Sequence, residues 1–586
     1  MCGIIGYVGK RQVAPIIFSG LKKLEYRGYD SAGIATMENG KIHIKKDAGR
    51  IRDINSRMKF TDLPGCVGMG HTRWATHGSV TKDNAHPHTD CTGELVLVHN
   101  GIIENFQELR RKLGDHKFES ETDTEILAHL IEEEMKGKDF VEACKSALKK
   151  VQGNYAVLVM DKDGKMIAAR KGSPLVIGVG KGEYFPASDI PAFLEYTKDV
   201  IYLHDYDFVV LDKNGPIFYN LKNGKDIKRE VSTVDWNAEQ AKKGEFEHFM
   251  LKEIIEQTET IQKAINQSDD VIKGVAEDIN NARGIFFVGC GTAFYACLTG
   301  SYIFSKVAKK HVNVVSGSEF PHFEHFLKEK TLVIAVSQSG ETADVLEAVK
   351  TAKRRGSRVL SIVNVMGSSL TRNSDKFLLT QSGPEICVLS TKAYTAQLAL
   401  LVLLAYAVAG KLEKGRDQLK KLYNLVYDLT ALTTRNQLRK LAEKLKNKNN
   451  MFTIGRGIMY PTALEGALKL KEVSYIHTEG FAGGDLKHGP IALVEDGTPC
   501  IAFVSEDTEK EILSNAMEIK SRGGYIIGVA SKNNEIFDYF IKVPSSNGCD
   551  PITHIIPIQI LAYQLAVLRG CDPDKPRNLA KSVTVK

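Results

Sequence analysis

Cys2 is the residue whose position in this 586-residue chain most directly suggests chemistry. If Met1 is removed, Cys2 carries a thiol and a free α-amine on the same carbon atom. The amine has a pKa of roughly 7.7–8.0 and the thiol one of about 8.5, so the amine can act as general base for the thiol near neutral pH. The alternative is a buried structural cysteine in a first strand, and the first six residues do not separate the two.

Three polar clusters in the first third could surround such a nucleophile. Residues 71–78 (His-Thr-Arg-Trp-Ala-Thr-His-Gly) follow an expected strand and hold six side chains that can hydrogen bond. Residues 98–101 are expected to end another strand in a turn, where the Asn100 amide and the Gly101 N–H could lie together. Residues 120–125 open an expected helix. The ordinary explanations are turn formation at 100–101 and helix capping by Thr122 or Asp123.

A second set of candidates lies in the last 340 residues. The run Ser-Gln-Ser-Gly-Glu-Thr at 337–342 links an expected strand to a helix, and its hydroxyls and the helix N-terminus could hold a phosphate. Helix capping is the alternative. Glu465, Lys469 and Glu472 share one helix face, with a solvated row of ion pairs as the alternative. The glycine-rich run 480–490 follows and presents His488.

An internal repeat indicates which elements position this second set. Gly289 recurs as Gly455, and Ser337 recurs as Ser505, at nearly the same offset along the chain. Each copy alternates strands and helices, which is typical of a doubly wound α/β parallel sheet with sites at the carboxyl ends of its strands. The second copy has two acids after Ser505, so we expect one phosphate site per chain.

The first third has a different pattern. Short apolar runs bounded by Gly, Asp or Asn predict an α+β layered fold with mostly antiparallel sheets, interrupted by helices near 15–24 and 124–135. The predicted division is a first domain at 1–221, a linker at 222–245, α/β domains at 246–410 and 449–570, connecting helices at 411–448 and a tail at 571–586.

Composition excludes several classes of protein. The chain is 43% hydrophobic and 25% charged with a net charge of +7, which argues against a nucleic-acid surface. The most apolar run, 396–410, is too short to cross a membrane, and no secretion signal is expected. Ten scattered cysteines without a C-x-x-C pair predict reduced thiols in a cytoplasmic protein, with no metal site.

The first third resembles a known enzyme family. The similar runs are Cys2–Ile4, Tyr26–Gly33, His71–Gly78, Asn84–His88, His99–Gly101 and Thr122–Glu125. They resemble the N-terminal-nucleophile glutaminase of glutamine amidotransferases and, more narrowly, the glutamine–fructose-6-phosphate aminotransferase family. The resemblance implies that Cys2 attacks the glutamine carboxamide and that Asn100 with the Gly101 N–H forms the oxyanion hole. It also implies that glutamine is bound by Arg73, Trp74, Thr76, His77 and Asp123, with Arg73 meeting the α-carboxylate and Asp123 the α-ammonium.

The resemblance continues to the last residues. It implies that both repeat copies are sugar isomerase domains, although Ala293 stands where a Ser is frequent and Asp485 where a Glu is usual. Glu472 would move a proton between sugar C1 and C2, His488 would assist ring opening, and Lys581 would form a Schiff base with the open ketose. The sugar phosphate would be bound by Thr292, Ser337, Gln338, Ser339, Thr342, Ser390 and Lys469.

The resemblance therefore implies a two-part reaction. Glutamine hydrolysis would supply ammonia internally, and fructose 6-phosphate would become glucosamine 6-phosphate, with no metal or organic cofactor. Related enzymes are homodimers in which the loop bearing His488 reaches the neighbouring site. An amidophosphoribosyltransferase fits less well, because the only Asp-Asp pair, 269–270, lies in a polar segment. A sugar-phosphate sensor or a deaminase with a vestigial glutaminase is the remaining alternative.

Overall fold

The chain folds into two compact units, described by a computed structural model over residues 2–74, 78–234 and 243–584. The first unit is formed by residues 1–242 together with 580–586, and the second by residues 243–579. Each unit has its own sheets and its own hydrophobic cores.

The first unit contains two antiparallel sheets. The eight-stranded sheet has the order β14-β11-β9-β10-β1-β4-β2-β3, and the six-stranded sheet has the order β13-β12-β8-β7-β6-β5. The first sheet comprises β1 (Gly3–Val8), β2 (Ser31–Glu38), β3 (Lys41–Ala48), β4 (Val67–Arg73), β9 (Val176–Gly180), β10 (Glu183–Ala187), β11 (Asp199–Tyr202) and β14 (Ser232–Thr233). The second comprises β5 (His88–Thr89), β6 (Leu95–Ile103), β7 (Gly153–Asp161), β8 (Met166–Lys171), β12 (Asp207–Asp212) and β13 (Gly215–Asn220).

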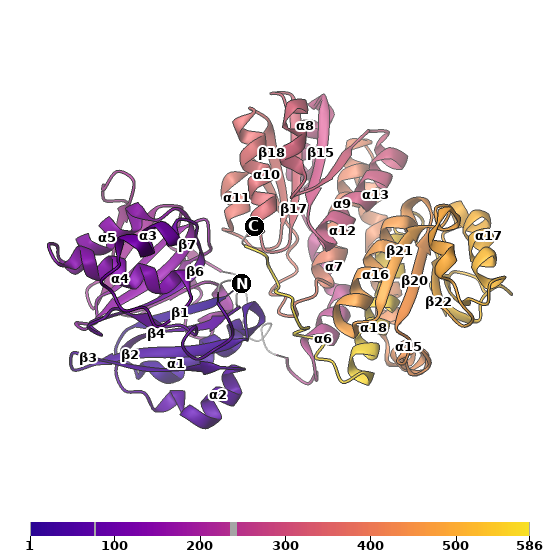
Figure 1. The fold of residues 1–586 in the computed structure, drawn as a ribbon. Helices are drawn as coiled ribbons and strands as arrows, with labels where there is room; N and C mark the ends of the chain where they lie inside the picture. Colours follow the sequence, from indigo (N-terminus) through magenta and orange to yellow (C-terminus); the bar gives the residue numbers. More distant parts are fainter. Residues whose placement is uncertain (1, 75–77, 235–242, 585–586) are drawn as a thin grey trace. The chain divides into compact units, whose positions relative to one another are not determined.

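Helices cover the outer faces of this pair of sheets (Figure 1). In β6, Leu95 and Leu97 point into the core shared with the helices, whereas Val96 and Val98 point into the core between the sheets. Since alternate strand residues face opposite sides, a continuous apolar run is what a strand buried on both faces requires. The helices are α1 (Val13–Leu24) and α2 (Ile51–Met58) beside the first sheet, and α3 (Phe106–Lys112), α4 (Asp123–Met135) and α5 (Phe140–Lys150) beside the second. The predicted α+β class of this unit is confirmed.

The second unit contains two parallel sheets whose orders, β16-β15-β17-β18-β19 and β21-β20-β22-β23-β24, are equivalent position by position. The predicted repeat of doubly wound α/β domains is therefore confirmed. In each sheet the second strand lies on one side of the first strand, and the third to fifth strands lie on its other side. This reversal of the strand order creates a switch point between β15 and β17 and between β20 and β22. The strands are β15 (Gly284–Gly289), β16 (Asn313–Ser316), β17 (Thr331–Ser337), β18 (Arg358–Val363), β19 (Lys376–Leu379), β20 (Asn450–Gly455), β21 (His477–Ala482), β22 (Pro499–Phe503), β23 (Tyr525–Ala530) and β24 (Tyr539–Lys542).

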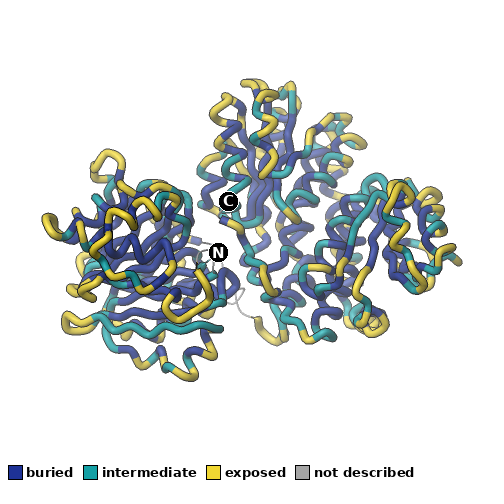
Figure 2. The backbone as a smooth tube through the Cα atoms, viewed as in Figure 1, coloured by how far each residue is buried: buried dark blue, intermediate teal, exposed yellow. Residues whose placement is uncertain are grey.

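Two long apolar helices form the centre of the second unit, where Figure 2 shows mostly buried backbone. They are α12 (Lys392–Val408) and α18 (Asp550–Leu568). Within the described ranges, α18 alone is long and apolar enough to cross a membrane, but 89% of its apolar window is buried in the protein, as in a core helix. The other helices are α6 (Phe249–Ile255), α7 (Gln257–Ile265), α8 (Asp269–Asn281), α9 (Thr292–Ile303), α10 (Ala343–Arg354), α11 (Ser369–Asn373), α13 (Leu412–Lys420), α14 (Leu422–Thr430), α15 (Leu432–Leu445), α16 (Tyr460–Ser474) and α17 (Glu509–Lys520).

Three local expectations differ from the structure. Asn100 and Gly101 do not lie in a turn, because β6 continues to Ile103 and pairs with β7 throughout. Residues 480–482, expected in a loop, form the end of edge strand β21, which the sequence pattern did not separate. Part of the expected linker belongs to the first unit, since Ser232–Thr233 pairs with β11.

Candidate active sites

The Cys2 thiol lies against the end of β4. Gly3 pairs with Thr72, so the chain just before β1 runs beside the residues that follow Thr72. The Trp74 N–H donates to Cys2 Sγ at 3.1 Å, and Sγ lies 3.5 Å from the Trp74 carbonyl oxygen. Burial raises the pKa of the Cys2 thiol, while the Trp74 N–H and the charge of Arg73 act in the opposite direction. The same groups that lower this pKa would stabilise a thiolate.

Asn100 is held beside Cys2 by a histidine. Its Nδ2 donates to the Cys2 carbonyl oxygen at 2.9 Å, and its Oδ1 lies 3.1 Å from His71 Nε2. His71 Nε2 also faces the His99 carbonyl oxygen at 3.1 Å, so both of its neighbours are acceptors and Nε2 carries the proton. Burial lowers the pKa of His71 to about 3, which keeps the ring neutral. This contact fixes the amide orientation and leaves the second Nδ2 hydrogen of Asn100 for another acceptor.

Gly101 is a glycine for a steric reason. Its φ of +131° is unfavourable for other residues, and a Cβ there would meet the Asn154 carbonyl oxygen at 2.0 Å. The residue therefore lets β6 pass close to β7 immediately after Asn100. Asn100 and the Gly101 backbone are adjacent on one strand, as the oxyanion-hole expectation requires, although the element is a strand and not a turn.

Arg73 and Asp123 supply opposite charges near the thiol. The Arg73 guanidinium donates to the carbonyl oxygens of Ser79 and Gly78 at 3.1 and 3.2 Å. Burial lowers its pKa, and the charges of Cys2 and Asp123 act to raise it. Asp123 Oδ2 accepts from the Ile103 N–H at 2.8 Å. The two expected glutamine-binding charges therefore belong to the same electrostatic environment as Cys2.

The other expected glutamine-binding residues have different outcomes. The Trp74 ring packs edge-on against Tyr29, with 5.6 Å between centroids. Thr76 and His77 lie outside the described residues. Thr122 is the N-cap of α4 and its side chain accepts from the Glu125 N–H, so the capping expectation for Thr122 is confirmed.

Buried histidines beside the site were not assigned a role by sequence reasoning. The His86 ring stacks on His71 with centroids 4.0 Å apart, and His88 Nε2 lies 3.2 Å from Thr122 Oγ1. Burial lowers the pKa of His86 and His88 well below the usual value, so both are neutral. The His-Pro-His run at 86–88 was the sequence signal for these histidines, because polar rings need hydrogen-bond partners once they are buried.

The predicted phosphate turn follows β17 at the switch point of the first parallel sheet. Ser337 Oγ accepts from the Gly340 N–H at 3.0 Å and lies 3.3 Å from Thr342 Oγ1. Ser339 Oγ accepts from the Glu341 N–H at 3.2 Å. Thr342 is the N-cap residue of α10 but makes no side-chain capping bond. Simple capping by Thr342 therefore does not account for its hydroxyl, which leaves the phosphate expectation for this turn in place.

A second cluster joins the two α/β domains inside the second unit. Lys469 Nζ lies 2.7 Å from Glu472 Oε2 and 3.4 Å from Glu465 Oε1, and it donates to Thr292 Oγ1 at 3.0 Å. Glu465 and Lys469 are fully buried, so the solvated-row alternative is wrong for them. Burial raises the pKa of Glu465 to about 8, partly offset by Lys469, and the two carboxylates raise the pKa of Lys469. One ammonium cannot neutralise both carboxylates, and Glu465 is the fully buried one of the two, so Glu465 holds a proton at neutral pH.

Thr292 of this cluster and the phosphate turn follow neighbouring strands of the first parallel sheet. Thr292 begins α9 after β15, whereas Ser337 ends β17, and the two strands are neighbours in parallel. The carboxyl ends of neighbouring parallel strands meet at one edge of the sheet, which is where α/β sheets bind ligands.

The remaining predicted residues are more scattered. Ser390 Oγ donates to Glu385 Oε2 at 3.3 Å just before α12. Gln338 accepts from the Asn364 N–H through its carbonyl oxygen at 3.1 Å. His488 is exposed in a short 3-10 turn, Leu486–His488. Lys581 belongs to residues 580–586, which are part of the first unit.

Comparison with known proteins gives consistent matches over the whole chain. Residues 71–195 match the glutamine amidotransferase domain, and residues 278–407 and 444–569 each match the SIS domain. The chain is 49% identical to the glutamine–fructose-6-phosphate aminotransferase (isomerizing) of Thermococcus kodakarensis, with 100% of both chains covered. It is 44% identical to the protein of that name from Thermus thermophilus, again with full coverage of both. The C-terminal domain of glucosamine-fructose-6-phosphate aminotransferase from Francisella tularensis is 35% identical with a TM-score of 0.53, over 57% of this chain and 99% of that one.

Proposed function

Because this chain belongs to the glutamine–fructose-6-phosphate aminotransferase family, we propose how its own residues divide that family's reaction between the two units. The enzyme converts D-fructose 6-phosphate and L-glutamine to D-glucosamine 6-phosphate and L-glutamate. The observation that carries the assignment is the pair of polar constellations, one around Cys2 and one around Lys469.

In the first unit, the Cys2 thiolate attacks the glutamine carboxamide carbon. The carbonyl oxygen gains negative charge in the tetrahedral intermediate, and it accepts hydrogen bonds from the second Asn100 Nδ2 hydrogen and the Gly101 N–H. His71 acts as a positioning residue, because its contact with Asn100 Oδ1 at 3.1 Å aims the amide toward Cys2. Loss of ammonia leaves a thioester, and water releases glutamate from it.

Removal of Met1 supplies the base for this step. The freed α-amine of Cys2 takes the thiol proton, and the same group returns it to the departing ammonia. Arg73 binds the glutamine α-carboxylate and Asp123 binds the α-ammonium, since an amino acid requires one fixed charge of each sign. Trp74, Thr76 and His77 complete the glutamine-binding loop.

In the second unit, the turn 337–342 binds the phosphate and the buried cluster handles the sugar. Glu472 transfers the proton between C2 and C1, and its ion pair with Lys469 at 2.7 Å holds the carboxylate in place. Lys581, from the tail that the structure groups with the first unit, forms the Schiff base with the ketose, and ammonia released at Cys2 then displaces the lysine. His488 assists ring opening, and Thr292 and Ser390 contribute polar contacts to the sugar phosphate.

We further propose that the active form is a cytoplasmic homodimer. The exposure of His488 supports this arrangement, because an exposed loop histidine can reach the sugar site of a second copy. Light scattering of the purified chain and complementation between inactive Cys2→Ala and His488→Ala chains would test it. Recovery of activity on mixing supports the shared site, and its absence from a proven dimer opposes it.

Product analysis tests the proposed function directly. The purified chain is incubated with fructose 6-phosphate and glutamine labelled with ¹⁵N in the amide group. We expect ¹⁵N in glucosamine 6-phosphate together with equimolar glutamate. A sugar-phosphate sensor would form no amino sugar, and a deaminase would release ammonia from glucosamine 6-phosphate without needing glutamine.

A further inference from the structure

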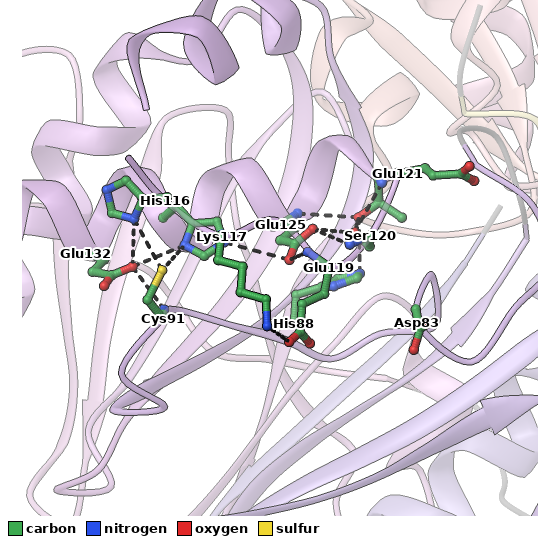
Figure 3. Close-up of polar contacts among 12 residues, drawn as sticks. Asp83, His88, Cys91, His116, Lys117, Glu119, Ser120, Glu121, Glu125 and Glu132 are labelled. Carbon is green, nitrogen blue, oxygen red and sulfur yellow. Dashed lines mark hydrogen bonds and ion pairs between the residues drawn. The ribbon is translucent and has the colours of Figure 1, made fainter. Parts of the chain in front are cut away.

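Four side chains that commonly bind metals converge in the first unit, away from Cys2 and its contacts. Cys91 follows β5, His116 lies between α3 and α4, and His129 and Glu132 are one turn apart on α4. One ligand atom from each lies within 4.8 Å of all the others. Figure 3 shows Cys91, His116 and Glu132 pointing toward one another. Three separate chain segments therefore contribute to one small polar focus.

Four of the six distances between the ligand atoms are close to those of a tetrahedral site, and the other two are below 4.8 Å. Cys91 Sγ lies 3.5 Å from His129 Nδ1 and 3.6 Å from His116 Nδ1. Glu132 Oε2 lies 3.1 Å from both Nδ1 atoms. With Zn–S near 2.3 Å and Zn–N and Zn–O near 2.0 Å, tetrahedral angles place sulfur about 3.5 Å and oxygen about 3.3 Å from the nitrogens.

The outer nitrogens of both histidines face carboxylates. His116 Nε2 lies within hydrogen-bond distance of Glu133 Oε2, at 3.1 Å, whereas His129 Nε2 lies 3.7 Å from Glu125 Oε1, which is too long for a hydrogen bond. Metal-binding histidines usually donate their second N–H to such a group, which leaves the inner nitrogen as a lone-pair donor. With protons on both Nε2 atoms, two lone pairs, a thiol sulfur and a carboxylate oxygen meet at one point. Such a cluster of lone pairs is suited to a bound cation.

We propose that Cys91, His116, His129 and Glu132 bind one Zn²⁺ ion in a structural site. A thiolate, two imidazoles and a carboxylate suit zinc better than Mg²⁺ or Ca²⁺, which prefer oxygen. Four protein ligands leave no open position for substrate, so the site is structural and not catalytic. A cavity of about 450 Å³, lined in part by Cys91 and His129, gives the ion a route to the site.

The ion would fasten two loops to α4. One loop carries Cys91 after β5, and the other carries His116 before the helix. The same helix begins at Asp123, and its N-cap Thr122 contacts His88 of β5. Zinc binding would therefore stabilise the part of the first unit around the start of α4, where Asp123 lies.

Metal analysis and cobalt substitution of the tag-free full-length chain test the proposal. We expect about one zinc per chain after dialysis against metal-free buffer. After removal of zinc, Co²⁺ should give a thiolate-to-cobalt charge-transfer band together with the visible bands of a tetrahedral ion. Cys91→Ser should abolish the charge-transfer band, whereas Cys66→Ser, which changes another exposed cysteine of the same unit, should retain it. Cys2→Ser should also retain it, which separates this site from the glutaminase thiol.

A second variant tests the carboxylate partner of His116 without removing any of the four proposed zinc ligands. Glu133→Gln weakens the support of His116, so zinc affinity should fall by roughly 10- to 100-fold while binding remains stoichiometric. A chelator should lower the melting temperature of the wild-type chain but not that of Cys91→Ser. The proposal is overturned if the wild-type chain holds no stoichiometric zinc and shows no thiolate-to-cobalt band. It is equally overturned if the band survives in Cys91→Ser, and the four groups then form only a hydrogen-bond network.

Discussion

Replacing Glu465 by Gln should change how the stability of the second unit depends on pH. Glu465 is fully buried beside Lys469, and its Oε2 has no hydrogen-bond partner among the described residues. Burial raises its pKa to about 8 because the charged form loses its hydration. Gln has nearly the same shape but cannot ionise, so Glu465→Gln removes the titration while leaving most of the packing.

The sign and size of the effect follow from proton linkage. Between pH 4.3 and 8 the unfolded carboxyl is ionised while the folded one keeps its proton, so the folded state binds more protons and loses stability as the pH rises. Over this whole pH range the free energy of unfolding falls by about 5 kcal/mol, at 1.36 kcal/mol per pKa unit. From pH 5.5 to 7.5 the loss of unfolding free energy is about 3 kcal/mol. For a unit the size of Lys243–Leu579, the usual unfolding entropy per residue converts this into a shift of about 4 °C.

Scanning calorimetry of the full-length chain at both pH values measures this shift. The melting temperature of the second unit in Glu465→Gln, relative to wild type, should increase by about 4 °C between pH 5.5 and 7.5. Glu506→Gln, which changes an exposed carboxylate of the same unit, should follow the wild type. Parallel wild-type and Glu465→Gln curves would refute the reasoning, because Glu465 would then be ionised and neutralised by Lys469 throughout.

Three further variants test the divided reaction. Cys2→Ala should abolish glutamine-dependent synthesis without weakening sugar-phosphate binding, since it removes the nucleophile alone; retained glutaminase activity would contradict the assignment. Lys581→Arg should give no adduct when borohydride is added with fructose 6-phosphate, because a guanidinium forms no Schiff base; an adduct in this variant would place the reactive lysine elsewhere. The double change Ser337→Ala and Ser339→Ala should raise KM for fructose 6-phosphate by about 10- to 100-fold, because hydrogen bonds to a charged group are lost. KM for glutamine should stay nearly constant. Equal effects on both constants would show that the phosphate binds elsewhere.

The sequence alone predicted the classes of fold because they depend on local and repeated signals. Continuous apolar strands such as 95–98 indicate burial on both faces, and the near-constant offset between Gly289 and Gly455 indicates two copies of one α/β unit. The spacing of Glu465, Lys469 and Glu472 predicts a shared helix face, which their contacts confirm. Signals of this kind can be recognised in the sequence without knowledge of what packs against each element.

Burial and contacts between distant segments were decided only by the tertiary structure. Periodicity places Glu465 and Lys469 on one helix face, but it does not show what packs against that face. In the structure Thr292, from the other α/β domain, contacts both side chains, and the two are buried. The turn signal at Asn100-Gly101 was misleading, because β7 pairs with β6 beyond Gly101 and the long-range pairing outweighs the local preference.

The predicted absence of a metal site rested on spacing along the chain. Cys91, His116 and His129 are too widely and irregularly separated to form a paired motif, and only the His129–Glu132 interval on one helix was a local sign. Folding brings α4 beside the two loops, and coordination depends on distance in space. The sequence by itself predicted the types of element and singled out Cys2 as the candidate nucleophile, because backbone preference and residue chemistry are local properties. The tertiary structure decided which charges are buried and which ligands meet, because both depend on packing between segments far apart in the chain.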